Sequence, residues 1–484
     1  MKKKLSLLAF IGFMLFALSS CTNRITLLFL NWGEYIDESL LDEFEDLHNC
    51  NVSMDLGESN EIFYSKVFAG TTVYDVVCPS DYMVMKMYKK GLLEEINFEQ
   101  GDDLDNTKYI SSYNPDSDIR EGVKSIRDDM ISGTDEDIVK YYVPYLWGTW
   151  GLMYSTKKDG LENAVINNPD GPWASLFRKN VPNGTRIAMY DSHQHAYYSA
   201  CRYLGKDVDK ELPQSELDEI RKLVEKTKFN AWGTDNIKKN IVADNLDLGF
   251  MWTGDFLYYY AEQAADRACR ALIDDKISND ELVPFLDAIL DNDADDITVS
   301  RTYKDLNQYE IGFDIYIPTD TIAFCDNLVI VKDKSRSNRK TQLIYDFINF
   351  MSSQKIDLRN EEAKEEDPDG ENASNDDFIY PTDANTQFVC YDTPFIETYH
   401  GILELRDDET IYDEDLLSDL KKNGSTSDAS SYNDSDIYWA AYNYALSIAF
   451  EKYYPENGKV GSILGSFDRK YVNLINNTFN NARA

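Results

Sequence analysis

Residues 24–91 alternate between short apolar runs and segments with helical spacing of apolar side chains, and this rhythm constrains the fold more than any other feature of the chain. Short β-branched and apolar runs are typical of strands, whereas apolar residues recurring every three or four positions indicate helices. The order strand, helix, strand, helix, strand is typical of a parallel α/β lobe. It predicts strands at 24–31, 51–56 and 74–79 and helices at 38–48, 60–69 and 81–91, with Ser80 placed to cap the third helix.

Three turns follow these predicted strands, at 32–35, 56–61 and 80–82. In open α/β sheets, ligands bind beyond the carboxyl ends of the strands. Each turn carries aromatic, acidic or hydroxyl side chains. Glu58 or Ser80 taken singly could equally be a helix cap, but three turns of this composition together favour a binding edge.

The same pattern returns later in the chain, between acidic stretches. Strands are predicted at 186–190, 248–252 and 322–331, and an amphipathic helix at 340–351. Acidic stretches with little apolar content lie at 101–140, 274–300, 355–378 and 413–436. Because such compositions bury little apolar surface, we expect mobile loops at 355–378 and 421–436.

The N-terminus has the organisation of an export signal with a lipid-modification site. Three lysines precede an apolar run from Leu5 to Leu18, which is too short to span a membrane as a stable helix. The run ends in LSSC at 18–21, which resembles the bacterial lipobox, where a signal peptidase cuts before a cysteine whose thiol carries a diacylglycerol. We therefore expect residues 1–20 to be removed and Cys21 to anchor the mature chain.

No later segment reaches the roughly 20 apolar residues that cross a bilayer, so we expect an ectodomain held by lipid alone at the outer face of the cell membrane. Without the three signal lysines, 86 Asp and Glu face 45 Lys and Arg, a net charge of −41 with His neutral. This balance argues against nucleic acid as a partner. It attracts cations, although its main effect is solubility. A hydrophobic content of 43% supplies the core of about two domains.

Six further cysteines carry no metal or redox signature. No CxxC pair is present, and no His/Cys cluster has zinc spacing. Several lie in apolar runs, which favours buried thiols over disulfides, and the sequence leaves any pairing open. They are Cys50, Cys78, Cys201, Cys269, Cys325 and Cys390.

Other motifs for metal binding or catalysis are incomplete. The run from Asp291 resembles the start of an EF-hand loop. However, Asp296 stands where the loop needs its turn glycine, and Thr302 stands where it needs its final glutamate. His193 and His195 lack an obvious third ligand. No P-loop, GxSxG, HExxH or dinucleotide fingerprint is present. We therefore expect no metal, no cofactor and no enzymatic activity.

Six separate stretches resemble the spermidine/putrescine-binding proteins of bacterial polyamine ABC importers. They are FLNWGEY at 29–35, ESNEIFY at 58–64, YDVVCPSDY at 74–82, PYLWG at 144–148, GFMWTG at 249–254 and DNLVI at 326–330. Their order follows the family over most of the first 350 residues, whereas the tail matches poorly apart from YPT at 380–382. The resemblance implies an α/β, two-lobed periplasmic-binding-protein fold of type II, with mixed sheets flanked by helices and the ligand in the cleft. By analogy, residues 24–146 plus 322–378 form the N-terminal lobe and 147–321 plus 379–484 the second lobe. Because members of the family are shorter, the resemblance also implies that the four acidic stretches are insertions or expansions on the surface.

The resemblance also implies a set of ligand contacts. Aromatic faces would cover the methylenes and attract ammonium groups, and carboxylates would pair with the amines. Core packing is the alternative role for each aromatic residue. The first lobe would contribute Trp32, Glu34, Tyr35, Ser80 and Tyr82, and further contacts would be Trp252, Asp326 and Tyr380, with Phe324 where the family usually has Trp.

One departure from the family weakens the case for spermidine in particular. Where the family commonly has Asp-Asp-x-Arg-Glu, this chain has DSHQH at 191–195, so Ser192 and His195 replace two carboxylates, and Asp191, Ser192 and His195 remain candidate contacts. Asp81 and Asp255 stand where the family has small or neutral residues. We therefore expect the acids to have moved within the site, and we include both as ligand contacts.

The leading hypothesis is a monomeric binding protein that captures a small cationic solute, a polyamine, and delivers it to ABC permease subunits with a cytoplasmic ATPase. It would perform no chemistry on the ligand. One alternative keeps the fold but binds another amine, an amino acid or a peptide-like cation. Another is an acidic surface lipoprotein with an adhesion role.

Overall fold

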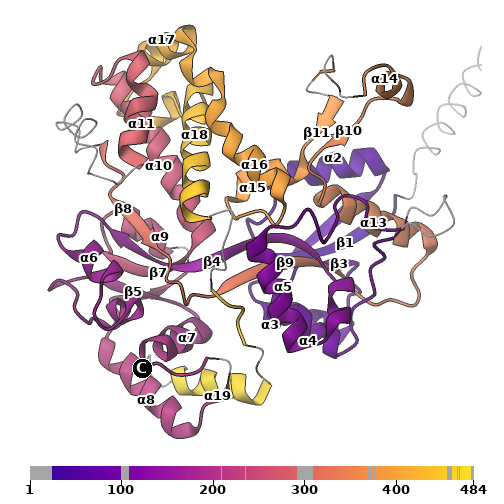
Figure 1. Cartoon of the computed structure of the whole chain (residues 1–484), viewed down its shortest axis with the longest axis horizontal. Helices are drawn as coiled ribbons and strands as arrows, with labels where there is room; N and C mark the ends of the chain where they lie inside the picture. The colour runs from indigo at the N-terminus through magenta and orange to yellow at the C-terminus, as the bar shows by residue number, and fades with distance from the viewer. Residues whose placement is uncertain are drawn as a thin grey trace, which may run out of the picture.

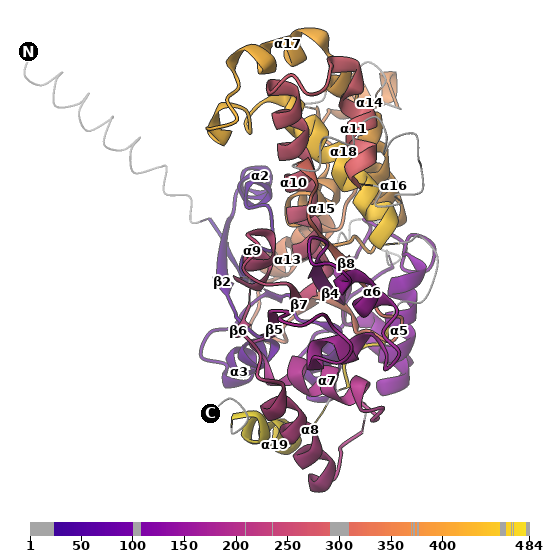
Figure 2. The ribbon, with the colours of Figure 1, turned by 90° about the vertical axis from the view of Figure 1, so that its left-hand side faces the viewer.

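The computed structural model describes residues 24–99, 108–208, 210–234, 236–290, 309–368, 370, 373–374, 377–454, 461–465, 467 and 469–480. The signal peptide, Cys21 and the run from Asp291 lie outside these residues. Two lobes stand side by side, with β4 and β9 between them and a tower of helices above the second lobe (Figure 1). Seen from the side, the tower rises from the sheet, and the last helix, α19 (Arg469–Asn480), lies below it beside α8 (Figure 2).

One mixed sheet runs through both lobes in the order β2-β1-β3-β9-β4-β7-β5-β6, and β8 pairs with the end of β4. β1 is parallel to β2 and β3, and β5 is parallel to β6 and β7, whereas β4 and β9 are antiparallel to their neighbours. The long strand β4 connects the lobes because its first half pairs with β9 and its second half with β7 and β8. The strands are β1 (Thr26–Asn31), β2 (Asn51–Leu56), β3 (Val76–Val77), β4 (Val143–Ser155), β5 (Ile187–Tyr190), β6 (Ala231–Gly233), β7 (Leu248–Trp252), β8 (Phe313–Tyr316) and β9 (Ala323–Ile330).

The predicted alternation over residues 24–91 is confirmed. β1, β2 and β3 alternate with α2 (Ser39–His48), α3 (Asn60–Ala69) and α4 (Asp81–Lys89), although β3 is shorter than predicted. The later predictions also hold, because β5, β7, β9 and α13 (Asn338–Met351) occupy the predicted ranges to within two residues. The remaining helices of the first three quarters are α5 (Glu121–Gly133), α6 (Leu161–Ile166), α7 (His193–Tyr203), α8 (Gln214–Thr227), α9 (Asn236–Val242), α10 (Thr253–Ile273) and α11 (Leu282–Leu290).

Three hydrophobic cores hold these elements. The first lies between β1, β3, β9 and the helices that cover them, where the rings of Phe29 and Phe44 pack 5.2 and 5.1 Å from that of Phe347. The third lies beneath β5 and β7, where Trp150 packs edge to face on Phe250 at 4.8 Å. We call the elements around the first core the first lobe, and those around the other two cores the second lobe.

The second core fills the tower, where α10 packs along α18 (Asp436–Tyr453). Small side chains allow the two helix axes to approach closely. They are all fully buried: Ala261, Ala265 and Ala268 on α10 and Ala441, Ala445 and Ala449 on α18. The Tyr-rich helix α18 is therefore the centre of the tower. The other late helices are α14 (Glu361–Glu366), α15 (Pro381–Val389), α16 (Ile396–Glu404) and α17 (Glu414–Asn423).

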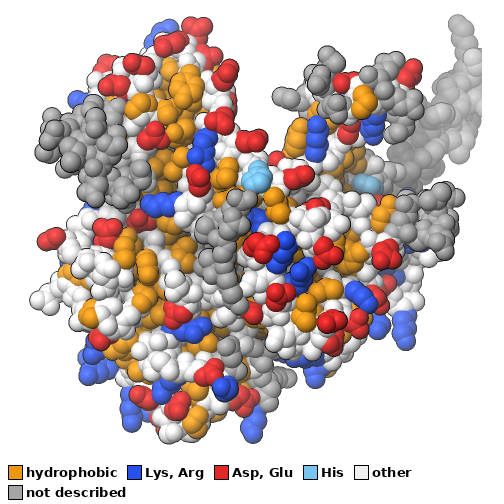
Figure 3. Space-filling view, in the orientation of Figure 1, with side chains coloured by type: hydrophobic (Ala, Val, Ile, Leu, Met, Phe, Trp, Pro, Cys, Tyr) orange, Lys and Arg blue, Asp and Glu red, His pale blue; other side chains and the backbone are white. Residues whose placement is uncertain are grey.

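Three of the acidic stretches contain helices that pack on the hydrophobic cores, which their composition did not indicate. α5, α11 and α17 lie in them, and each buries apolar residues, including Ile126, Leu286 and Leu417. An amphipathic helix needs only one apolar stripe, so acidic residues on its other face lower the average without preventing burial. Acidic and basic side chains are interspersed over the face seen in Figure 3, which suits a role in solubility.

The two expected mobile loops also contain regular contacts. Within 355–378, β10 (Ile356–Asp357) pairs with β11 (Phe378–Ile379), and the guanidinium of Arg359 binds the carboxylate of Asp357 at 2.6 Å. Within 421–436, Tyr432 is almost fully buried and donates a hydrogen bond to Asp266 at 2.6 Å. In both segments, single aromatic or charged residues therefore form specific contacts, although the average composition indicated loops.

All six described cysteines are buried free thiols, as predicted from their apolar surroundings. Among the described residues, no helix has the length and apolar character that crossing a membrane requires.

Candidate functional site

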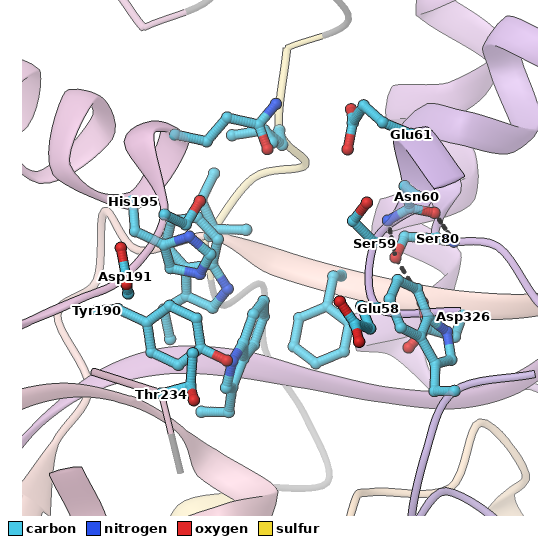
Figure 4. Close-up of a pocket in the computed structure, with 18 of the residues that line it drawn as sticks. Glu58, Ser59, Asn60, Glu61, Ser80, Tyr190, Asp191, His195, Thr234 and Asp326 are labelled. Carbon is cyan, nitrogen blue, oxygen red and sulfur yellow. Dashed lines mark hydrogen bonds between the residues drawn. The ribbon is translucent and has the colours of Figure 1, made fainter. Parts of the chain in front are cut away.

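A cavity of about 650 Å³ opens between the two lobes. All three turns after β1, β2 and β3 line it on the first lobe's side, and the start of α7, α9, the end of β7 and the start of α10 line it on the other side (Figure 4). Thirteen of the fourteen residues proposed from the sequence lie in its wall. They are Trp32, Glu34, Tyr35, Ser80, Asp81, Tyr82, Asp191, Ser192, His195, Trp252, Asp255, Phe324 and Asp326.

The carboxylate of Asp326 is held by two hydroxyl groups of the first lobe. Tyr35 donates to Oδ2 at 2.8 Å, and Ser80 donates to Oδ1 at 2.5 Å. Asp326 is 4% exposed, and burial raises its pKa to about 6. In the described part of the chain, no Lys or Arg forms an ion pair with it, so this buried acid has hydrogen-bond donors but no counter-charge.

Ser80 does not cap α4 with its side chain, contrary to the prediction. It occupies the N-cap position, but its hydroxyl is turned to Asp326, and its backbone N–H and Oγ are held by the amide of Asn60 at 3.0 and 2.9 Å. The nearby carboxylate competes successfully for the hydroxyl because a hydrogen bond to a charged acceptor is stronger than one to a backbone amide.

Asp81 faces the cavity, yet its carboxylate oxygens accept backbone N–H groups. Oδ2 accepts from Cys325 at 2.9 Å, and Oδ1 accepts from Tyr82. Asp81 is 1% exposed, and burial raises its pKa to about 7. The contact with Cys325 ties the start of α4 to β9, which gives Asp81 a structural task next to Asp326.

Aromatic rings form a continuous row from His195 to Tyr35, whose hydroxyl meets Asp326. Such a row can cover an alkyl chain and attract cations to its ring faces. The successive rings are His195, Trp252, Phe324, Tyr391 and Tyr35, with centroids 5.2, 4.8, 6.0 and 5.2 Å apart.

His195 is an aromatic wall residue at the second lobe's end of the row. Its ring lies between Trp150 and Tyr190, stacked at 4.2 and 4.5 Å, and burial lowers its pKa to about 3. The imidazole is therefore neutral at physiological pH. His193 instead contacts Asn476 at 3.0 Å, and among the described residues no group of His, Cys, Asp and Glu is arranged to hold a metal.

Asp255 already has a cationic partner. Lys238 of α9 donates to its Oδ1 at 2.6 Å, and both side chains are largely buried. Lys238 therefore already supplies the positive charge that the prediction assigned to a ligand amine at Asp255. Lys238 is the one Lys or Arg among the described lining residues, against seven acidic side chains: Glu34, Glu58, Glu61, Asp81, Asp191, Asp255 and Asp326.

Tyr380 is the predicted contact that the structure leaves outside the cavity. It precedes α15, is 41% exposed, and packs near Phe378. Tyr391, which was not predicted from the sequence, lines the wall instead. Gly254 makes room for it, since a Cβ at this position would lie 2.3 Å from the Tyr391 ring.

The C-terminal segment also contributes to the wall, which sequence reasoning missed. The described residues after the tower return to the second lobe, and Ser462 pairs with Ile322 next to β9. This return places three side chains in the lining, namely Leu464, Val472 and Asn476. The amphipathic spacing of 469–480 was the available signal, but nothing in the sequence says which lobe the helix covers.

The sequence is similar to a family model and to several known proteins over part of its length. Residues 1–210 match the model of a family described as Hypothetical lipoprotein (MG045 family). The spermidine/putrescine-binding periplasmic protein of Salmonella typhimurium is 27% identical over 233 residues, which are 47% of this chain and 59% of that protein. The alignment therefore spans less than two thirds of this relative. The resemblance predicted from the motifs is confirmed.

Solved structures share the fold over nearly the whole chain. A candidate spermidine/putrescine ABC transporter protein from Listeria monocytogenes is 20% identical, with a TM-score of 0.51 over 95% of this chain and 98% of that one. A lipoprotein of Treponema pallidum is 17% identical, with a TM-score of 0.51 over 94% and 99%. The predicted α/β periplasmic-binding-protein fold is confirmed.

Proposed function

We propose that this chain captures a polyamine cation in the cavity between its lobes and performs no chemistry on it. The observation that carries the proposal is Asp326, a buried carboxylate that two hydroxyl groups orient and that no described cation neutralises. Burying an acid without a counter-charge is costly, which is why its pKa rises. An ammonium group of the ligand would supply the missing charge.

The rest of the cavity suits the remainder of a polyamine. The row of rings beginning at Tyr35 offers faces for the methylene chain, and the acidic rim attracts cations from solution. Relatives named for spermidine and putrescine binding support this class of ligand. Another small amine remains the alternative, because Ser192 and His195 replace two of the family's usual carboxylates.

We further propose that Cys21 carries a lipid and that the protein delivers its ligand to ABC permease subunits. The match of residues 1–210 to a lipoprotein family supports the anchor. The division into 24–146 plus 322–378 and 147–321 plus 379–484 stays a prediction. In it, β4 and β9 pass between the lobes and are the segments about which a closing motion would turn.

Calorimetry with the chain from residue 22 onward tests the ligand class. Putrescine, spermidine, spermine, lysine and arginine would be titrated separately at physiological salt. We expect saturable binding of at least one polyamine and weaker binding of both amino acids, whose carboxylate would meet the acidic wall. No binding of any polyamine, or tighter binding of an amino acid, would overturn the proposal.

A further inference from the structure

The two ends of the cavity differ in charge. At the first lobe's end, Asp326 and Asp81 are buried acids with no cation in the described chain near enough to pair with them. At the second lobe's end, His195 is neutral, and Lys238 already occupies Asp255. Figure 4 shows Asp326 and His195 on opposite sides of the space. A ligand that spans the cavity therefore meets a demand for positive charge at one end only.

The second lobe's end also carries polar groups without partners. Among the described residues, the indole N–H of Trp150, which is 2% exposed, has no acceptor, and neither ring nitrogen of His195, which is 7% exposed, has a hydrogen-bond partner. Both side chains line the cavity. Buried polar atoms in this state are unusual, and each costs free energy until something pairs with it.

The types of these groups define what would satisfy them. An indole N–H can only donate, and a neutral imidazole offers one donor and one acceptor. An ammonium group has three donors and no acceptor, so it would leave the Trp150 N–H unpaired. A neutral amide has a carbonyl oxygen that can accept from Trp150 and His195 and, where secondary, an N–H that can donate to the imidazole.

Two charged groups near this end could alter the balance. Lys238 adds a positive charge that opposes a second ammonium, although Asp255 compensates it at 2.6 Å. Asp191 is exposed at the rim, where solvent weakens its attraction for a cation. Neither group replaces the two carboxylates that the resemblance leads one to expect at positions 192 and 195.

We propose that the preferred ligand is a polyamine acylated on one terminal nitrogen, with its free ammonium at Asp326 and its neutral amide at Trp150 and His195. This inference rests on the proposed function, since it names the ligand class of the same cavity. It gives a physical reason for the exchange of carboxylate for His195: an acylated nitrogen carries no charge to pair with.

Titration of the wild-type chain from residue 22 onward tests the inference without any variant. Four probes built on a four-carbon chain would be compared: N-acetylputrescine, putrescine, butylamine and 4-aminobutyrate. We expect N-acetylputrescine to bind about tenfold or more tightly than putrescine, whose second ammonium would be desolvated without a partner. Butylamine should also bind more weakly than N-acetylputrescine, because it leaves Trp150 and His195 unpaired.

The outcomes separate the inference from the proposed function. Putrescine binding as tightly as N-acetylputrescine would overturn the inference and leave polyamine capture standing. Butylamine matching N-acetylputrescine would overturn it as well, since the amide would then contribute nothing. Tighter binding of 4-aminobutyrate than of N-acetylputrescine would also overturn the inference, because the second lobe's end would then prefer an anion to a neutral amide. Binding of none of the amines would overturn both proposals.

Two substitutions locate the amide contact. Trp150→Phe keeps a ring and removes the N–H, so N-acetylputrescine should fall towards the affinity of butylamine while putrescine changes little. Trp173→Phe is the matched control, because Trp173 is equally buried in the same core but bonds Asp320 and does not line the cavity. His195→Glu should reverse the preference in favour of putrescine. An unchanged ratio of affinities in folded Trp150→Phe, checked by circular dichroism, would overturn the assignment.

Discussion

The hydroxyl of Tyr35 donates a hydrogen bond to Oδ2 of Asp326 at 2.8 Å, although 291 residues separate them in the chain. Tyr35 follows β1, and Asp326 lies in β9, two strands away in the sheet. The backbone carbonyl of Tyr35 is in turn held by the hydroxyl of Tyr145 at 3.0 Å. The acid is therefore oriented before any ligand arrives, which lowers the entropic cost of binding.

Asp326→Asn should reduce the affinity for a polyamine by about two to three decades, because the ammonium would be desolvated without its counter-charge, at a cost of roughly 3–5 kcal/mol. Tyr35→Phe should cost less, about tenfold, because it removes one hydrogen bond to the carboxylate and keeps the ring. Calorimetry on folded variants measures both. Equal polyamine affinity in wild type and Asp326→Asn would refute a cationic ligand at this site.

The affinity should fall as the pH is lowered. Burial raises the pKa of Asp326 in the empty protein to about 6, so the carboxylate that pairs with ammonium is present above this pH and is lost below it. Between pH 7 and pH 5 we expect about a tenfold loss of affinity. The pKa of Asp81, raised to about 7, places a second titration in the same window. Asp326→Asn is the control, since any slope that remains in it belongs to other groups.

Trp252→Ala should weaken binding through lost contact area and a lost cation–π attraction of about 0.5–2 kcal/mol. Trp252 lies within the aromatic row, between His195 and Phe324, so both a diamine and an uncharged analogue of equal length should lose affinity. Asp326→Asn, by contrast, should affect the diamine far more. Trp439→Ala is a suitable control because this residue is 50% exposed on the tower, outside the cavity lining. Wild-type affinity in the Trp252→Ala variant would show that this ring does not contact the ligand.

Arg120→Met should destabilise the protein by roughly 3–5 kcal/mol, since it leaves Asp392 buried without its counter-charge. Arg120 pairs with Asp392, donates to the carbonyl of Tyr454 at 2.9 Å, and stacks over Tyr399 at 3.7 Å. Arg127→Met removes a partly exposed pair with Asp116 and should cost no more than about 1 kcal/mol. Urea unfolding provides the comparison. Adding Asp392→Asn to Arg120→Met should recover part of the loss, and a loss as small as that of Arg127→Met would contradict the prediction.

Cys21→Ala should abolish labelling with radioactive fatty acid and release the protein from membranes, because the lipid would have no thiol to attach to. The experiment is done in bacterial cells that express the full chain, followed by fractionation. Cys50→Ala is the matched control, since that thiol is buried in the first core. Labelling that persists in Cys21→Ala would refute the assignment of Cys21 as the lipid-modified residue.

Much of the site could be predicted because its residues lie at the ends of recognisable strands. The turn at 32–35 follows β1, and the turn at 80–82 follows β3, so parallel pairing brings both to one edge of the sheet. Tyr380 and Tyr391 show the limit of this reasoning. They lie eleven residues apart on either side of α15, and which of them reaches the cavity depends on how α15 docks and on the space that Gly254 leaves.

The sequence by itself determined the strand and helix order of residues 24–91, the burial of the cysteines and the resemblance to polyamine-binding proteins, because these depend on local periodicity and short motifs. Only the tertiary structure decided that the Ser80 hydroxyl donates to Asp326 and does not cap α4. The same holds for the pairing of Lys238 with Asp255 and for the C-terminal residues that line the cavity. Each of these contacts joins residues that are separated in the sequence. Distance and burial in the folded protein decide which contacts form, and local sequence patterns do not encode them.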